Sequence, residues 1–343
     1  MNNVKRKNVA IMVMAANMEP STRNLEAIKD TMVKYHHDNK DVLKHNYDWY
    51  FYWCDNTIDQ EVVVEKSDEY DNLYLMKVRD EESVYRTFEK TIKVFDYVSR
   101  MTQTDGETEK PYYDWYVRIN ISMFLNLRLL DAAINVLKPD RIYGNALNSI
   151  VNLNSRFCND LYVRGDLMVF DKGVMEGILK HALKYMYSDL KMKVRDGVDH
   201  VDDCLIGCCF IDHIGEEYYK NLYMFDYQYL PQSEVSETDV LEMNPYCIGA
   251  RVKTVPPTET YSGYSWDDNE FRKMDGVKIH KLYDWMCGQK KDYMALQVRD
   301  LLVDKKESRP TLFINASNQN VYDVFYKYLE QKYAAIRQQH KKN

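Results

Sequence analysis

Short apolar runs alternate with longer segments of helical period along most of the chain. Residues 9–15 form the first apolar run, and the aromatic stretch 49–53 forms the second. Runs of this length are typical of strands that are buried on both faces. Between them, residues 21–36 carry apolar side chains at helical spacing, and Ser21 or Thr22 can cap that helix. The alternation predicts an α/β fold with a mostly parallel sheet covered by helices.

The same pattern predicts further elements along the chain. The other predicted strands cover residues 73–75, 115–119, 246–253 and 311–314, and residues 162–166 are a predicted short strand and turn. The other predicted helices cover residues 81–101, 123–137, 172–187, 266–285, 293–302 and 321–336. The polar segments 102–108 and 145–159 are predicted loops, and the second is a candidate binding loop. After Pro256-Pro257 the pattern becomes mainly helical, so we expect a first domain over residues 1–255 and a helical C-terminal extension over 256–343.

Charge and composition narrow the class of protein. The net charge of −7 argues against a protein that binds nucleic acid mainly by neutralising phosphates. The 29 tyrosines suit a cleft that stacks sugars or bases, although packing in strands explains most of them. The seven cysteines lie mostly in apolar runs without zinc-binding spacing, which predicts a reducing compartment and no metal site. No apolar stretch is long enough to span a bilayer, so a cytoplasmic protein is expected.

Several nucleotide and hydrolase motifs are absent from the sequence. There is no GxGxxG or Walker motif, which argues against dinucleotide oxidoreductases and P-loop nucleotidases. There is also no GxSxG elbow and no HExxH motif.

Two polar clusters mark the candidate site. The predicted strand 115–119 delivers Arg118, Asn120 and Ser122 to its carboxyl edge, and Asp202-Asp203 begins another apolar segment. Ligands bind at the carboxyl edges of strands in open α/β sheets, so a two-sided site is expected. Structural alternatives remain open. Arg118 can pair with a neighbouring acid such as Asp114, and the two aspartates can cap a helix.

Four segments in order resemble landmarks of known enzymes. They are Glu89-Lys90-Thr91, residues 116–124, residues 162–171, and Asp202-Asp203-Cys204-Leu205-Ile206-Gly207. Over residues 9–255 the chain resembles GT-A-type nucleotide-sugar glycosyltransferases, closest in outline to β-1,3-galactosyltransferase-like families. The resemblance implies a GT-A-like, Rossmann-related sheet and transfer of a sugar from a nucleotide-sugar donor, such as a UDP-sugar, to a hydroxyl acceptor.

The resemblance also implies roles for particular residues. Asp203 stands where the family has its general base, with Asp202 beside it, and the implied stereochemistry is inversion. The glycine turn of Arg164, Gly165 and Asp166 stands on the acceptor side. Donor contacts are expected from strand ends and matched segments, namely Asn17, Asp55, Lys90, Arg118, Asn120, Ser122, Arg251 and Lys253.

One departure from the family pattern matters for mechanism. The family's metal-binding Asp-x-Asp position is Asn120-Ile121-Ser122 here, which gives no support for a Mn or Mg ion. Two hypotheses follow from this departure, and a third rests on other features of the sequence. The enzyme dispenses with a metal and uses Arg118, with Arg164, Arg251 or Lys253, against the leaving charge. Alternatively, the chain is a noncatalytic sugar- or nucleotide-binding module. A glycosyltransferase that acts on modified DNA is the third, supported by the tyrosines and the basic C-terminal run.

Overall fold

The computed structural model describes residues 5–80, 87–105, 108–144, 147–149, 161–163, 165–186, 201–215, 222–225, 227–229, 244–253, 269–291, 293 and 296–302. Within these residues the largest sheet has eight strands. In sheet order they are β13 (Leu222–Met224), β9 (Ile142–Gly144), β12 (Leu167–Asp171), β7 (Trp115–Asn120), β1 (Asn8–Met14), β2 (Asn46–Cys54), β4 (Leu73–Val78) and β3 (Val62–Lys66). Only β12 and β3 run antiparallel to their neighbours in this sheet. The predicted mostly parallel sheet flanked by helices is therefore confirmed.

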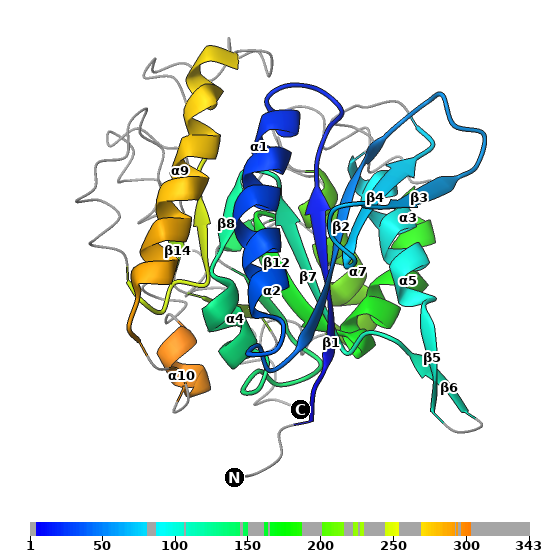
Figure 1. Cartoon of the computed structure of the whole chain (residues 1–343). Coiled ribbons are helices and arrows are strands. Elements are labelled where there is room, and N and C mark those ends of the chain that lie inside the picture. Colours follow the sequence, from blue (N-terminus) through cyan, green and yellow to red (C-terminus); the bar gives the residue numbers. More distant parts are fainter. Residues whose placement is uncertain are drawn as a thin grey trace, which may run out of the picture.

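Helices cover both faces of this sheet (Figure 1). One face carries α1 (Ser21–Ile28), the π-helical turn η1 (Lys29–Val33), α2 (Lys34–Asn39), α4 (Leu127–Ala133) and α9 (Asn269–Gly288). The other face carries α3 (Thr87–Ser99), α5 (Lys172–Met186) and α7 (Val201–Ile214). Side chains alternate along β1 as a strand requires, so Val9 and Ile11 enter the first core and Ala10 and Met12 enter the second. This double burial explains the continuous apolar runs of the central strands.

A small second sheet brings a late part of the chain to the end of β7. It contains β14 (Tyr227–Tyr229), β15 (Gly249–Arg251) and β8 (Met123–Leu125). β15 pairs with β8 in antiparallel register, so that Arg251 lies opposite Met123. The Val252 amide donates to the Ser122 carbonyl at 3.0 Å. The chain after β15 is thereby fixed beside the residues that follow β7.

Several predicted elements differ from the structure. The helix expected over residues 123–137 begins only at Leu127, because β8 precedes it and the Asn126 side chain caps α4 by accepting from the Leu129 amide at 3.2 Å. The loop expected over residues 102–108 contains β5 (Thr102–Asp105), which pairs with β6 (Thr108–Pro111). The helix expected over residues 21–36 is confirmed, and it continues through η1 to the end of α2.

The C-terminal part of the chain is described only in part. The helix expected over residues 266–285 is present as α9, which packs beside α1. Among the described residues of the predicted helix 293–302, only α10 (Val298–Leu301) is helical. The elements predicted at 311–314 and 321–336 lie outside the described residues, as does most of the loop 145–159, where β10 (Leu147–Ser149) pairs with β11 (Leu161–Val163). Among the described helices, none has the length and apolar character that a membrane span needs.

Candidate active site

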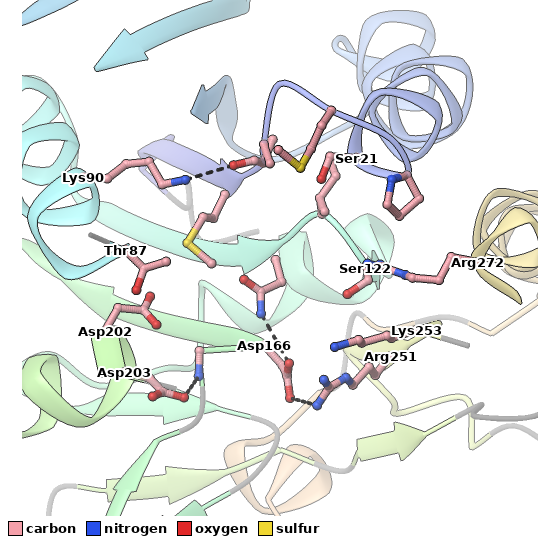
Figure 2. A pocket seen from close by; sticks show the side chains of 18 of the residues that line it. Ser21, Thr87, Lys90, Ser122, Asp166, Asp202, Asp203, Arg251, Lys253 and Arg272 are labelled. Atoms are coloured by element: carbon pink, nitrogen blue, oxygen red, sulfur yellow. Dashed lines mark hydrogen bonds and ion pairs between the residues drawn. The ribbon is translucent and has the colours of Figure 1, made fainter. Parts of the chain in front are cut away.

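A cavity of about 320 Å³ opens at the carboxyl ends of β1 and β7. That volume is at the small end of the range for pockets that bind small molecules. The residues after both strands line it, together with the first turns of α1, α3, α7 and α9 and the end of β15. Figure 2 shows Asp202 and Asp203 on one side of this cavity and three cationic side chains on the other. Asp166 lies between the two sides, and Lys90 lies on the side of the two aspartates. The cavity therefore lies where the sheet topology places a ligand.

Asp202 and Asp203, which we call the acidic wall, lie in the first turn of α7. The positive end of the helix dipole favours carboxylates at this position. Asp202 forms an ion pair with Arg118, whose side chain has no exposed surface. Asp203 Oδ2 accepts a hydrogen bond from the Gly165 amide at 2.9 Å. The acidic wall is thus held by β7 and by the turn before β12.

The Arg118 side chain lies behind the acidic wall and does not line the cavity. Burial lowers the pKa of Arg118, but the neighbouring carboxylates, Asp202 foremost, outweigh that effect and the net pKa is raised. The sequence allowed a salt bridge between Arg118 and a neighbouring acid such as Asp114, and the structure shows a salt bridge to Asp202 instead. The Asp114 carboxylate instead accepts from the Asn8 amide at 3.0 Å. Arg118 is therefore placed to orient the acidic wall, not to contact a donor directly.

Position 165 requires a glycine because the backbone there passes close to the Arg118 guanidinium. A Cβ atom at this position would lie 2.1 Å from Arg118 Nη1, far inside any real contact. The backbone can approach the buried guanidinium only because glycine has no side chain. The close approach also brings the Gly165 amide to Asp203. Gly165 thus connects Arg118 to the second aspartate.

Arg251, Lys253 and Arg272 form the opposite side, which we call the basic wall. Arg251 Nη1 lies 3.0 Å from Asp166 Oδ2, and Asp166 Oδ1 accepts from Asn120 Nδ2 at 3.4 Å. Arg272 is paired with Asp275 at 2.9 Å. Burial, with the positive charges of Arg251 and Arg272, lowers the pKa of Lys253 to about 7. Arg251 and Arg272 therefore lie close enough to Lys253 to disfavour its charged form.

Nine of the residues proposed from the sequence line this one cavity. They are Lys90, Asn120, Ser122, Gly165, Asp166, Asp202, Asp203, Arg251 and Lys253. Lys90 lies on α3 and donates to the Ala15 carbonyl at 3.1 Å, across from the basic wall. Asp166 was expected on the acceptor side, but its carboxylate contacts Asn120 and Arg251, both expected to bind the donor.

Other proposed residues lie elsewhere. Asn17 is exposed and does not line the cavity. Asp55 also lies outside it and accepts from the Thr57 amide and hydroxyl in a turn, at 2.9 and 2.6 Å. Arg164 lies outside the described residues. Sequence reasoning missed Arg272, because a charged pair at positions i and i+3 of a helix is usually an exposed pair.

The described residues do not fit a divalent metal at the Asn120-Ile121-Ser122 segment. Hard divalent cations take several oxygen ligands, chiefly carboxylates. The Asp166 carboxylate, which contacts Asn120 of this segment, is already paired with Arg251. Within the described ranges, no group of three or more His, Cys, Asp or Glu side chains is placed to hold a metal ion.

Comparisons with known proteins give likenesses of fold only. No protein-family model matches the chain, and no curated protein matches it in sequence. Three similar solved structures are a glycosyltransferase involved in glycosylation of the major capsid of PBCV-1, the galactosyltransferase LgtC in complex with donor and acceptor sugar analogues, and the glycosyltransferase GlyE of Streptococcus pneumoniae TIGR4.

The TM-scores and sequence identities of these three similar structures are low. The TM-scores are 0.37, 0.36 and 0.35, and the sequence identities are 8%, 9% and 12%, in the same order. The matches cover 79%, 78% and 82% of this chain, and 98%, 95% and 64% of the other chains. Because these scores lie below 0.5, the function proposed next rests on the geometry of the cavity.

Proposed function

We propose that this protein is a glycosyltransferase that moves a sugar from a nucleotide-sugar donor to a hydroxyl acceptor, with inversion at the anomeric carbon. The observation that carries the proposal is the polarised cavity, in which the acidic wall faces the basic wall at the carboxyl ends of β1 and β7. The GT-A-like order of sequence landmarks and the mostly parallel sheet support the same function.

The polarity of the cavity suits the charge that develops during sugar transfer. In the transition state the sugar becomes oxocarbenium-like and positive, while the departing phosphate gains negative charge. Carboxylates on one side and cations on the other stabilise this separation more than they stabilise the neutral ground state of the reacting centre. The basic wall would receive the leaving diphosphate, and the acidic wall would face the sugar and the acceptor.

Asp203 is the proposed general base. Its carboxylate would take the proton of the acceptor hydroxyl while that oxygen attacks the anomeric carbon. The bond from the anomeric carbon to the phosphate oxygen breaks, and its electron pair leaves with the nucleoside diphosphate. The hydrogen bond from the Gly165 amide orients Asp203 for this role. Asp202 is the weaker candidate, because its carboxylate is already engaged in the ion pair with Arg118.

The proposed reaction uses basic side chains where related enzymes use a metal. Guanidinium groups bind phosphate oxygens through paired hydrogen bonds, and Arg251 and Arg272 both line the cavity. Lys253 also lines the cavity and adds a third positive charge below its lowered pKa of about 7. We therefore expect activity to persist in the presence of a metal chelator.

The test is a donor panel. UDP-, GDP- and CMP-sugars are incubated with the protein in EDTA, with and without added Mn²⁺, and nucleotide release and the thermal unfolding midpoint are measured. The proposal predicts that at least one donor is hydrolysed or raises the midpoint in EDTA. Failure of every donor under both conditions would contradict it.

A noncatalytic nucleotide- or sugar-binding module is the second candidate. It is favoured by the absence of carboxylates in Asn120-Ile121-Ser122 and by the ion pair that occupies Asp202. Such a module would bind a donor without consuming it. Nothing in the described residues favours modified DNA as the acceptor.

A further inference from the structure

The basic wall draws on a helix that the sequence assigned to a separate extension. Arg272 lies near the start of α9, and its side chain enters the cavity close to Ser122 (Figure 2). Arg251 and Lys253 reach the same wall from β15. The basic wall therefore gains its third cationic side chain because α9 packs beside α1.

Asp275 fixes the direction of the Arg272 side chain. Arg272 Nε and Nη2 each lie 2.9 Å from Asp275 Oδ2, and Asp275 has no exposed surface. Asn24 of α1 donates to the same oxygen at 3.4 Å. One turn along α9, Lys278 Nζ lies 3.5 Å from the Val252 carbonyl. These contacts connect α9 both to α1 and to the segment that carries Lys253.

Charge in this region is unevenly balanced. Each guanidinium of the basic wall has one buried carboxylate, Asp166 for Arg251 and Asp275 for Arg272. Lys253 is influenced by both guanidinium groups and by both carboxylates, and the net result of burial and charge is a pKa lowered to about 7. An anion with two linked phosphates can contact separated cations at once, which a single phosphate does less well.

We infer that Arg272 makes the basic wall selective for a diphosphate over a monophosphate, and that Asp275 is the residue that positions Arg272. This narrows the donor to a nucleoside-diphosphate sugar. The choice of donor class rests on the proposed function, but the anion selectivity is measurable without any sugar transfer.

The experiment compares anion affinities by calorimetry. Wild type, Arg272→Gln, Arg272→Lys and Asp275→Asn are titrated with UDP and GDP, with the matching monophosphates, and with inorganic pyrophosphate. Arg272→Gln is expected to weaken diphosphate and pyrophosphate binding by roughly tenfold or more, with a much smaller loss for monophosphates. Asp275→Asn should likewise weaken diphosphate and pyrophosphate binding much more than monophosphate binding. Arg272→Lys should recover part of it, because the charge returns without the forked donors.

A matched control removes an exposed arginine. Arg100, which directly follows α3, has a side chain that is 75% exposed and lies outside the cavity, so Arg100→Gln should leave every affinity unchanged. Thermal unfolding checks that each variant is folded. If Arg272→Gln does not fold, Arg272→Lys carries the same comparison, with a smaller but still diphosphate-selective loss.

The possible results separate the two proposals. Equal losses for monophosphates and diphosphates, or no loss, would overturn the role of Arg272. Pyrophosphate binding that depends on Arg272, together with no consumption of any donor, would support the subsite and contradict the transferase. Sugar transfer at an unchanged rate in Arg272→Gln would support the transferase and contradict the proposed role of Arg272.

Discussion

The two walls of the cavity are both built from nearly buried charges, but their charges are compensated differently. In the acidic wall, Asp202 is paired with the buried Arg118, and the α7 dipole favours both carboxylates. In the basic wall, three cations share the carboxylates of Asp166 and Asp275. Burial, together with the positive charges of Arg251 and Arg272, lowers the pKa of Lys253 to about 7.

This difference indicates which wall is stabilised by the charge of a bound ligand. The acidic wall is stabilised by the protein itself, so its carboxylates are held in place before any substrate arrives. The basic wall gains most when an anion enters, because the anion relieves the repulsion among its cations. We therefore expect the acidic wall to hold its carboxylates in a fixed orientation and the basic wall to bind the negative charge of the ligand.

The largest expected effect is on turnover and comes from the acidic wall. Asp203→Asn keeps an oxygen for the Gly165 amide but removes the proposed base, so turnover should fall by about 10²- to 10⁴-fold. Donor affinity should stay near that of wild type. Nucleotide release and donor binding are measured in parallel. Asp212→Asn, on the same helix but outside the cavity, is the matched control. Unchanged turnover in Asp203→Asn would leave only the binding-module hypothesis.

The pairing of Arg118 with Asp202 predicts a large effect on stability. Arg118→Met leaves a buried carboxylate without its cation, which should lower the free energy of unfolding by about 3–5 kcal/mol. The double variant Arg118→Met with Asp202→Asn should recover much of that loss. Urea denaturation of the two single variants and the double variant measures the coupling. Simple additivity of the losses would show that the pair does not stabilise the acidic wall.

Gly165 gives a smaller, steric test of the same wall. Gly165→Ala forces a methyl group against Arg118 Nη1, so we expect a loss of about 1–3 kcal/mol in the free energy of unfolding. Gly276→Ala on α9 is the control, because its Cβ would lie 3.6 Å from Ala27 Cβ, an ordinary contact. Denaturation midpoints of the two variants should therefore differ. Equal midpoints would mean that the close approach of Gly165 is not needed.

The smallest expected effect is a pH dependence of the basic wall. Lys253, with its pKa lowered to about 7, is charged below that pH and becomes neutral above it. The charged form binds a diphosphate better, so affinity for a nucleoside diphosphate should fall as pH rises, by roughly tenfold between about pH 6 and about pH 9. Calorimetry in buffers of different ionisation enthalpy should detect proton uptake on binding near neutral pH. Lys253→Met should abolish most of this dependence, and an unchanged pH profile would contradict the assignment.

The sequence predicted the central sheet and most of the cavity because both depend on local patterns. Apolar runs identify buried strands such as β1 and β2, and polar residues just after β7 fall at the edge where ligands bind. Long-range contacts were not predictable in the same way. The partner of Arg118 lies 84 residues away, in the first turn of α7, and nothing in the strand sequence indicates it.

Arg272 shows the limit most clearly. In the sequence, Arg272 and Asp275 resemble an exposed pair on a surface helix, and only the packing of α9 against α1 buries them. The sequence pattern also missed four strands of the eight-stranded sheet, each of them short, namely β3, β9, β12 and β13. The division into residues 1–255 and 256–343 and the cytoplasmic location stay predictions.

The most direct test of the whole account is a crystal structure of the protein soaked with a nucleoside diphosphate, with and without Mn²⁺. We predict that, even without the metal, the two phosphates contact Arg251, Lys253 and Arg272. The terminal phosphate should lie on the side of the diphosphate that faces Asp203. Phosphates bound away from the basic wall, or bound there only through Mn²⁺, would contradict it.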